Sequence, residues 1–464
     1  MIKKYFWLIP LLLVFFIYGV SVGTYRMFPF QQIKHAKDIL DRTFEMELSA
    51  ENISGSTQST ILQRLLIKKV KIGDQIGSGG GISNSGSILF LITNKGSIQA
   101  FDIDKFREFN VESKDVPLNL EELFNSGIFT NDDVELIWYR VNGVYSEQVD
   151  STTYRLFVSH NGFDSTENCI THNISSTDLK LTDLTVNQVS NWNTIFTAEP
   201  CIDPNPEHYL SSHPYEGSVS GGTIIEFNEN QLLVTIGEYM RHGLNNAEAY
   251  SMDPAIPYGK MVVVDKKSGD WSIYSTGHRN PAGLFIDESG TIWSTENGPL
   301  GGDELNIIKP GTNYGWPLVS LGVWYVPTYR LTGGRDYGRH TGYQKPVFSW
   351  PNSIAPAALL RIQGDKFRYW SGDLIVGTRA NQSLRRLRLD DSLRVIYDER
   401  IDLGHRVRDL TALPDESIAI FTDDGYLIFI DDGGSSFHQM GPNEHQRLRK
   451  LENYDRFQVT SNRE

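Results

Sequence analysis

Cysteine is scarce in this chain of 464 residues, which contains only Cys169 and Cys201. No C-x-x-C-H motif occurs, so a covalently attached c-type haem is excluded, and the spacing of the pair matches no metal-ligand pattern. Outside the cytoplasm such a pair can form one disulfide. Two unpaired buried thiols are the alternative, and both readings stay open. Redox chemistry through these cysteines is not expected.

Basic residues are also under-represented. The chain has 43 Lys and Arg against 57 Asp and Glu, which gives a net charge of −14. Sequence-independent binding of nucleic acid depends on neutralising phosphates with Lys and Arg. The charge balance therefore argues against a nucleic-acid partner. The acidic excess is not concentrated in one block, and scattered charge is typical of a solvated surface.

One long apolar run is present, at the N-terminus. Lys3 and Lys4 precede an uncharged stretch, residues 5–25, and about 20 apolar residues are enough to span a membrane as a helix. Basic residues before the run favour a cytoplasmic N-terminus. A cleaved signal peptide is the alternative, but residues 20–22 make a poor cleavage site. We expect residues 1–25 to be a transmembrane signal-anchor, with the rest of the chain on the periplasmic or extracellular side.

Helical periodicity is limited to short stretches. Residues 30–40 carry apolar positions at helical spacing, and a second amphipathic piece runs from Ile61 to Val70. We therefore expect a short helical stem over residues 26–78. The polar tail, residues 433–464, is expected to be a short helix or a loose end.

Most of the chain has the texture of β-strands. From about residue 80, apolar runs alternate with turns rich in Gly, Asn and Asp, as in residues 86–98, 228–236, 287–293 and 414–430. Acidic-Gly turns between β-branched or aromatic runs are typical of hairpins, and a repeat of about 50–70 residues fits four-stranded blades. Six such units begin near residues 80, 134, 218, 283, 357 and 408. We predict an all-β fold, a six-bladed β-propeller over residues 79–432.

The most informative stretch runs from Gly277 to Pro317. It contains Gly277-His278-Arg279-Asn280-Pro281-Ala282-Gly283-Leu284, then Glu296-Asn297-Gly298-Pro299-Leu300-Gly301-Gly302-Asp303-Glu304-Leu305-Asn306, then Asn313-Tyr314-Gly315-Trp316-Pro317. Adjacent carboxylates beside glycine carbonyls suit a hard cation such as Ca²⁺. A hairpin loop whose carboxylates face water is the alternative from composition alone.

This stretch resembles the signature of the soluble PQQ-dependent glucose dehydrogenases and aldose sugar dehydrogenases, the glucose/sorbosone dehydrogenase family. The family pattern reads G-x-R-N-P-x-G-L, then E-x-G-P-x-G-G-D-E-x-N, then N-Y-G-W-P. A weaker resemblance extends over about residues 195–430 and includes Arg406-Val407-Arg408-Asp409. Residues 80–195 match in texture alone. The resemblance implies a propeller that uses PQQ and Ca²⁺ to oxidise a sugar.

The resemblance also implies roles for particular residues. It assigns four side chains to the quinone pocket: Arg279, Asn280, Arg406 and Arg408. Guanidinium groups bind carboxylates bidentately, and PQQ carries three carboxylates. It assigns four positions to a Ca²⁺ site: the backbone oxygens of Gly298 and Pro299, Glu304, and the Tyr314 region. In the family one such ion supports the fold or a homodimer, and another lies on the quinone.

The chain departs from the family at its catalytic base, the histidine of H-x-x-G-R-L. Alignment on Gly222 puts Val219 at that position, and valine cannot accept a proton, so the family mechanism fails there as written. His213 and His242 are alternative bases, and ordinary structural histidines are the other interpretation. Two further positions differ from the family. Ala380 stands where the family has a lysine, with Arg379 beside it as a possible replacement, and Glu238 stands where the family has an aspartate. The family's Gly-Gln-Gly-Gly motif is absent.

Three functions stay open. The first is a membrane-anchored periplasmic PQQ-dependent dehydrogenase that oxidises a sugar or sugar derivative with an altered base. The second is a catalytically inactive propeller that binds a glycan or envelope partners, and the third is a calcium-dependent hydrolase of the lactonase kind. Fold cannot separate them, because function resides in the site. The retained Arg and Asn residues favour the first, whereas Val219 and Ala380 favour the second. No catalytic residue is assigned.

Overall fold

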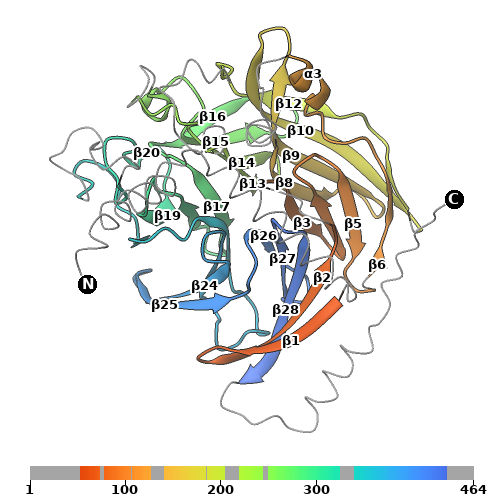
Figure 1. The fold of residues 1–464 in the computed structure, drawn as a ribbon, viewed down its shortest axis with the longest axis vertical. Helices are drawn as coiled ribbons and strands as arrows, with labels where there is room; N and C mark the ends of the chain where they lie inside the picture. The colour runs from red at the N-terminus through yellow and green to blue at the C-terminus, as the bar shows by residue number, and fades with distance from the viewer. Residues whose placement is uncertain are drawn as a thin grey trace, which may run out of the picture. The chain divides into compact units, whose positions relative to one another are not determined.

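The described part of the chain is made almost entirely of β-sheet. The computed structural model describes residues 53–73, 78–105, 107–126, 140–183, 185–203, 219–243, 249–323 and 339–435. Apart from residues 53 and 54, these belong to one unit, residues 55–211 and 215–464. Within this unit six sheets surround a common centre (Figure 1).

Each sheet is one blade, numbered here in the order in which the inner strands occur. Blade 1 contains β3 (Gly81–Ser85), β4 (Ile88–Ile92), β5 (Ile98–Asp102) and β6 (Arg107–Glu108). Blade 2 contains β7 (Asn110–Glu112), β8 (Val141–Gln148), β9 (Thr153–Asp164), β10 (Cys169–Thr182), β11 (Thr185–Gln188) and β12 (Asn193–Thr197). Blade 3 contains β13 (Gly221–Asn228), β14 (Gln231–Ile236), β15 (Lys260–Asp265), β16 (Trp271–Thr276) and β20 (Thr312–Asn313).

Blade 4 contains β17 (Pro281–Ile286), β18 (Ile292–Glu296), β19 (Asp303–Ile308) and β21 (Phe348–Trp350). Blade 5 contains β22 (Pro356–Arg361), β23 (Leu374–Thr378), β24 (Ser383–Leu389) and β25 (Val395–Asp402). Blade 6 contains β26 (Val407–Ala412), β27 (Ile418–Thr422), β28 (Tyr426–Ser435), β2 (Gln63–Lys71) and β1 (Ile53–Ser59). The helical elements of the described residues are α3 (Leu120–Asn125) and the 3₁₀ turn η3 (Tyr250–Met252).

The inner strands of the six blades form a closed ring. β3 contacts β8, β8 contacts β13, β13 contacts β17, β17 contacts β22, β22 contacts β26, and β26 contacts β3 again. The inner strands begin close to the six positions expected from the sequence. The predicted six-bladed propeller is therefore confirmed.

Blade 6 is completed by an early segment of the chain. β2 runs antiparallel to β28, with Ile67 opposite Ile430, and Figure 1 shows the two strands side by side. The helix expected over Ile61–Val70 is therefore wrong, and so is the helical stem over residues 53–71. The edge of β28 supplies backbone hydrogen-bond partners that an amphipathic helix would leave unpaired. Residues 26–52 lie outside the described part.

Two further sequence expectations concern the ends of the chain. No helix in the described ranges is long and apolar enough to cross a membrane, and the anchor expected at residues 1–25 lies outside those ranges. β28 extends to Ser435, so the expected tail begins inside a strand. The remainder of the tail, residues 436–464, also lies outside the described part.

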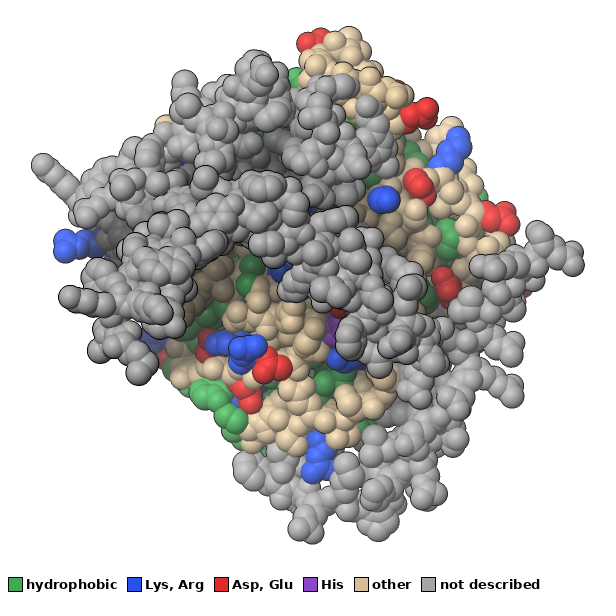
Figure 2. Space-filling view, viewed as in Figure 1, with side chains coloured by type: hydrophobic (Ala, Val, Ile, Leu, Met, Phe, Trp, Pro, Cys, Tyr) green, Lys and Arg blue, Asp and Glu red, His purple; other side chains and the backbone are tan. Residues whose placement is uncertain are grey.

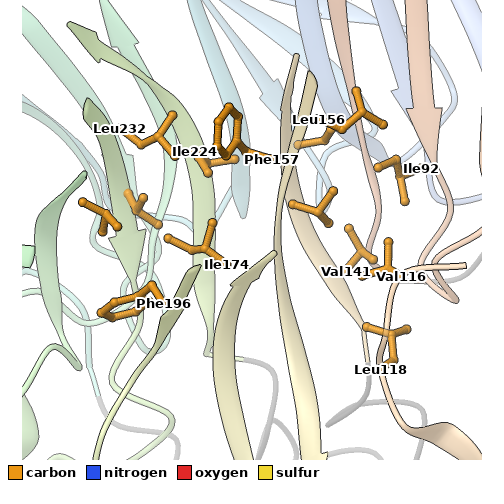
Figure 3. Packing of buried hydrophobic residues seen from close by; sticks show 14 of the residues in the cluster. Ile92, Val116, Leu118, Val141, Leu156, Phe157, Ile174, Phe196, Ile224 and Leu232 are labelled. Carbon is orange, nitrogen blue, oxygen red and sulfur yellow. The ribbon is translucent and has the colours of Figure 1, made fainter. Parts of the chain in front are cut away.

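The core lies between neighbouring blades. Leu156 and Phe157 are consecutive in β9 and both fully buried, because alternate side chains of a strand point to opposite faces. Figure 3 shows Leu156 beside Ile92 of blade 1 and Phe157 beside Ile224 of blade 3. Burying one such side chain stabilises the fold by about 1.5–3 kcal/mol. Each blade is thereby packed on both faces.

Cys169 and Cys201 form a disulfide. The bond joins the start of β10 to the segment after β12, next to the bridge between Ile170 and Ile202. This settles the alternative that the sequence left open.

Candidate functional site

The central channel contains a cavity of about 320 Å³, lined by the inner strands and by the loops that precede and follow them. This volume is within the usual range of small-molecule sites. Its polar lining includes Arg140, Asn142, Asn280, Arg379 and Arg408. On the described part of the face in Figure 2, acidic and basic side chains are interspersed, so the concentration of arginine in the cavity is local.

Four arginines form what we call the arginine cluster: Arg140, Arg379, Arg406 and Arg408. Among the described residues, the carboxylate that forms ion pairs with members of this cluster is that of Asp423, which follows β27. Arg408 lies 2.6 Å from Asp423 and Arg406 lies 3.1 Å from it. Arg408 and Arg140 also reach the same hydroxyl, that of Ser78, at 2.9 and 3.4 Å. Guanidinium groups from different blades thus converge on one region.

The pKa values reflect this crowding of positive charge. Burial, followed by the charge of Arg408, lowers the pKa of Arg140 to about 10. The same two causes lower the pKa of Arg379 to about 9. Asp423 acts in the opposite direction on both groups. Asp423 forms ion pairs with two of the four guanidinium groups, those of Arg406 and Arg408, so several positive charges lie close together at the cavity.

Arg279 lies apart from this cluster. Its Nη1 donates to the carbonyl oxygens of Asn297 and Gly298 at 3.0 and 2.9 Å, and its guanidinium stacks on Trp316, 5.5 Å from the ring centroid. Asn297 lies between Arg279 and the cluster: its carbonyl oxygen accepts the hydrogen bond from Arg279, and its side-chain oxygen accepts one from Arg379 at 3.2 Å. Arg279 is therefore fixed by its own loop.

The four side chains expected in the quinone pocket are only partly brought together. Asn280 and Arg408 line the cavity, whereas Arg279 and Arg406 are not among the described residues that do. Arg406 and Arg408 already pair with Asp423, so three free guanidinium groups do not converge as expected. The sequence interpretation missed Arg140. This residue lies in the part of the chain that resembles the family only in its alternation of strand-like runs and turns, with no shared motif.

Three of the four positions expected to bind Ca²⁺ surround a second, smaller cavity. Gly298, Glu304 and Tyr314 line it together with Glu296 and Arg279, and its volume is about 20 Å³. Pro299 is not among the described lining residues. A cavity of this size accommodates one water molecule or ion. No group of three or more His, Cys, Asp or Glu side chains within the described ranges is placed to hold a metal.

The atoms at this small cavity that could bind a metal ion are mostly oxygen atoms. Burial raises the pKa of Glu304, and the nearby Glu296 adds to the effect. Asp303 is not available as a ligand, because it accepts hydrogen bonds from the backbone of Gly298 and from Ser353, Ile354 and Ala355. Carboxylate and carbonyl oxygens are ligands that suit a hard cation, but the Glu304 carboxylate already lies 3.5 Å from His340 and accepts a hydrogen bond from Asn306 at 3.1 Å. Arg279 already donates to one of those carbonyls, that of Gly298.

Val219, where the sequence interpretation places the family base, lies beside a buried acid. Gly221 pairs with Ile236, and the Tyr239 N–H donates to the Val219 carbonyl at 2.9 Å, so Val219 lies opposite Glu238. Glu238 is fully buried, and neither carboxylate oxygen accepts a hydrogen bond of normal geometry from a described residue. Burial raises the pKa of Glu238 to about 8, against the opposing effects of Arg279 and the Trp316 N–H.

One of the two alternative histidines, His242, lies within the described residues. His242 is buried, and burial together with the charge of Arg279 lowers its pKa to about 3. It is therefore neutral at physiological pH, and it packs edge-on against Trp316. His213 lies outside the described residues.

Comparison with known proteins gives consistent matches. The family model described as Glucose / Sorbosone dehydrogenase matches residues 155–429. Aldose sugar dehydrogenase YliI of Escherichia coli K12 is 30% identical over 224 residues, which are 45% of this chain and 58% of that protein. Quinoprotein glucose dehydrogenase B of Acinetobacter calcoaceticus is 27% identical over 204 residues, 32% of this chain and 42% of that protein. The chain thus spans about half the length of the curated relatives it matches.

Solved structures resemble the whole propeller. The PQQ-bound form of aldose sugar dehydrogenase from Streptomyces coelicolor superposes with a TM-score of 0.53 at 17% identity, covering 82% of this chain and 98% of that one. At this identity the likeness concerns the fold.

Proposed function

Because the chain belongs to the glucose/sorbosone dehydrogenase family, we propose that it is a sugar dehydrogenase-like protein that binds PQQ in its central cavity. The observation that carries the proposal is the arginine cluster: Arg379 and Arg408 line a cavity of about 320 Å³, and Arg408 shares Asp423 with Arg406. Guanidinium groups bind carboxylates in a bidentate geometry. A bound quinone would accept the hydride that the sugar loses when it is oxidised.

The residues at the cavity fit such an anion. Asn280 uses its side-chain oxygen to accept the Gly221 N–H at 3.1 Å, so its amide NH₂ group remains for a ligand. Arg408 and Arg379 supply positive charge from blades 6 and 5. The Ca²⁺ site proposed at Glu304 is supported by the oxygen donors around the smaller cavity, and it would compensate the two carboxylates of Glu296 and Glu304.

Sugar oxidation by the family route is proposed to be weak. Removal of the hydroxyl proton by a positioned base contributes typically about 10²–10⁴-fold, and Val219 has no group that accepts a proton. This supports a second candidate, a catalytically inactive propeller that binds a glycan or envelope partner. Ala380, which is exposed where the family has lysine, favours the same candidate.

The proposed location is the periplasmic or extracellular side of a membrane. The apolar run at residues 5–25 supports an anchor, and the Cys169–Cys201 disulfide supports an oxidising compartment. A homodimer is proposed on the family resemblance alone.

The test uses the full-length chain, purified in detergent and mixed with PQQ and Ca²⁺. Saturable binding seen as a change in PQQ absorbance, with slow reduction of an artificial dye by aldoses, is expected. Failure to bind PQQ would refute the proposal, and binding with no dye reduction for any aldose would favour the inactive propeller. Reduction at ordinary enzymatic rates would instead refute the reasoning about Val219.

A further inference from the structure

Asn297 lies between the two cavities. It follows Glu296 at the end of β18 and occupies a position that the family signature leaves open, the x of E-x-G-P. The residue is 7% exposed and lines the smaller cavity. Burying an amide is costly unless its polar groups are hydrogen-bonded. The partners of Asn297 therefore show what it holds in place.

Every hydrogen-bonding group of Asn297 has a partner. Its backbone N–H donates to the Asn280 carbonyl at 3.0 Å, and its backbone carbonyl accepts from Arg279 Nη1 at 3.0 Å. Its side-chain Nδ2 donates to the Pro356 carbonyl at 2.9 Å, and its side-chain oxygen accepts from Arg379 Nη2 at 3.2 Å. A carbonyl can only accept and a guanidinium can only donate, so these two partners fix the orientation of the amide. The side-chain oxygen must face Arg379.

Arg379 depends on this contact for the direction of its side chain. Its backbone N–H donates to the Ala355 carbonyl at 3.0 Å, which fixes where the side chain begins. Further out, Nη2 donates to Asn297, whereas Nε has no hydrogen-bond partner in the described part of the chain. Among the described residues, the Asn297 oxygen is thus the acceptor that orients this guanidinium, which lines the central cavity.

A buried carboxylate fixes the frame around Asn297. Asp303 is fully buried. One of its oxygens accepts the Gly298 N–H at 2.9 Å, and the other accepts hydrogen bonds from residues 353–355 at 2.8–2.9 Å. These contacts tie the residue after Asn297 to the segment that leads into Pro356, the other side-chain partner of Asn297. The amide is therefore held from both sides before any ligand binds.

We propose that Asn297 is a positioning residue that aims the Arg379 guanidinium into the central cavity. Asn297 itself is not among the described residues that line that cavity, so it acts on a ligand through Arg379. A guanidinium held in one direction loses less conformational entropy when an anion binds than one that is free to rotate. The proposal deepens the proposed function and rests on it for the identity of the ligand, PQQ.

The test is titration calorimetry of the full-length chain and its variants with PQQ. Asn297→Ala removes the acceptor and should weaken the Kd about tenfold, because Arg379 must then be ordered on binding. Arg379→Gln should weaken the Kd as well, and the double variant should bind no more weakly than Arg379→Gln alone. Such non-additivity is expected when one residue acts through the other, and not when Asn297 merely supports the fold. Asn173→Ala is the matched control, since it removes a side-chain hydrogen bond of 2.9 Å, to Thr171 in blade 2, and Asn173 lines neither cavity.

Each variant is first compared with the unmodified chain by thermal unfolding. If Asn297→Ala does not fold, Asn297→Ser takes its place, because its hydroxyl is too short to reach Arg379, and the same results are expected. An unchanged Kd in the folded variant, or a double variant whose loss is the product of the two single losses, overturns the positioning role and leaves the proposed function standing. Failure of the unmodified chain to bind PQQ overturns the proposed function and the positioning role with it.

Discussion

The buried acid opposite Val219 makes the stability of the protein depend on pH in a predictable direction. Glu238 is fully buried, and its pKa is about 8 in the folded chain against an ordinary 4.5. Between these values the folded state keeps the proton that the unfolded state has lost. The native state therefore binds more protons, and the free energy of unfolding falls as pH rises through this window.

The magnitude follows from the width of the window. Each pH unit corresponds to about 1.36 kcal/mol, so the carboxyl should cost the fold up to about 5 kcal/mol between pH 4.5 and 8. Glu238→Gln has nearly the same shape and cannot ionise. We expect this variant to gain stability relative to the unmodified chain as pH is raised, with little difference below pH 4.5.

The assay is denaturant unfolding of both proteins at several pH values from 4.5 to 8.5, and the quantity compared is the difference between their free energies of unfolding. Taking the difference removes the contribution of other buried groups, such as Asp409, whose pKa burial raises to about 6. A difference that stays constant over this range would refute the assignment of a raised pKa to Glu238.

Three further outcomes are expected. The double variant Val219→His with Ala380→Lys should raise the rate of dye reduction by PQQ-loaded protein by about 10²-fold or more, since it restores a base; no gain would show that the base is not what limits the reaction. Calcium should raise the Tm of the unmodified chain, and Glu304→Ala should abolish that rise; equal Tm values with calcium and with chelator would contradict the site. Replacing Cys169 and Cys201 by serine should cost about 2–4 kcal/mol, and unchanged denaturation curves would show that the disulfide does not stabilise the fold.

The fold was predictable because its signals are local. Turns such as Asp287–Gly290 lie between apolar runs, and both the turn chemistry and the strand pattern can be recognised within about ten residues. β2 could not be assigned in this way. Its partner β28 is far away in the sequence, and residues 63–70 alone are compatible with either a helix or a strand.

The site was predictable in its residue types and less so in its geometry. The signature identified Arg279, Arg406 and Arg408, but not that Arg279 binds carbonyls of its own loop or that the other two share Asp423. Such pairings depend on which loops the ring brings together. Arg140 belongs to no recognisable motif. The sequence feature that could have pointed to it, a basic residue directly before an apolar inner strand, is weak.

The closure of blade 6 has a consequence for how the protein is made. Until β28 emerges, the chain is an open arc with two unsatisfied sheet edges, β2 at its start and β27 at its end. Pairing across so great a sequence separation is slow, and exposed strand edges recruit other chains. A chain that stops before Tyr426 should therefore aggregate rather than persist as a five-bladed protein, because the last strand joins the two ends of the ring.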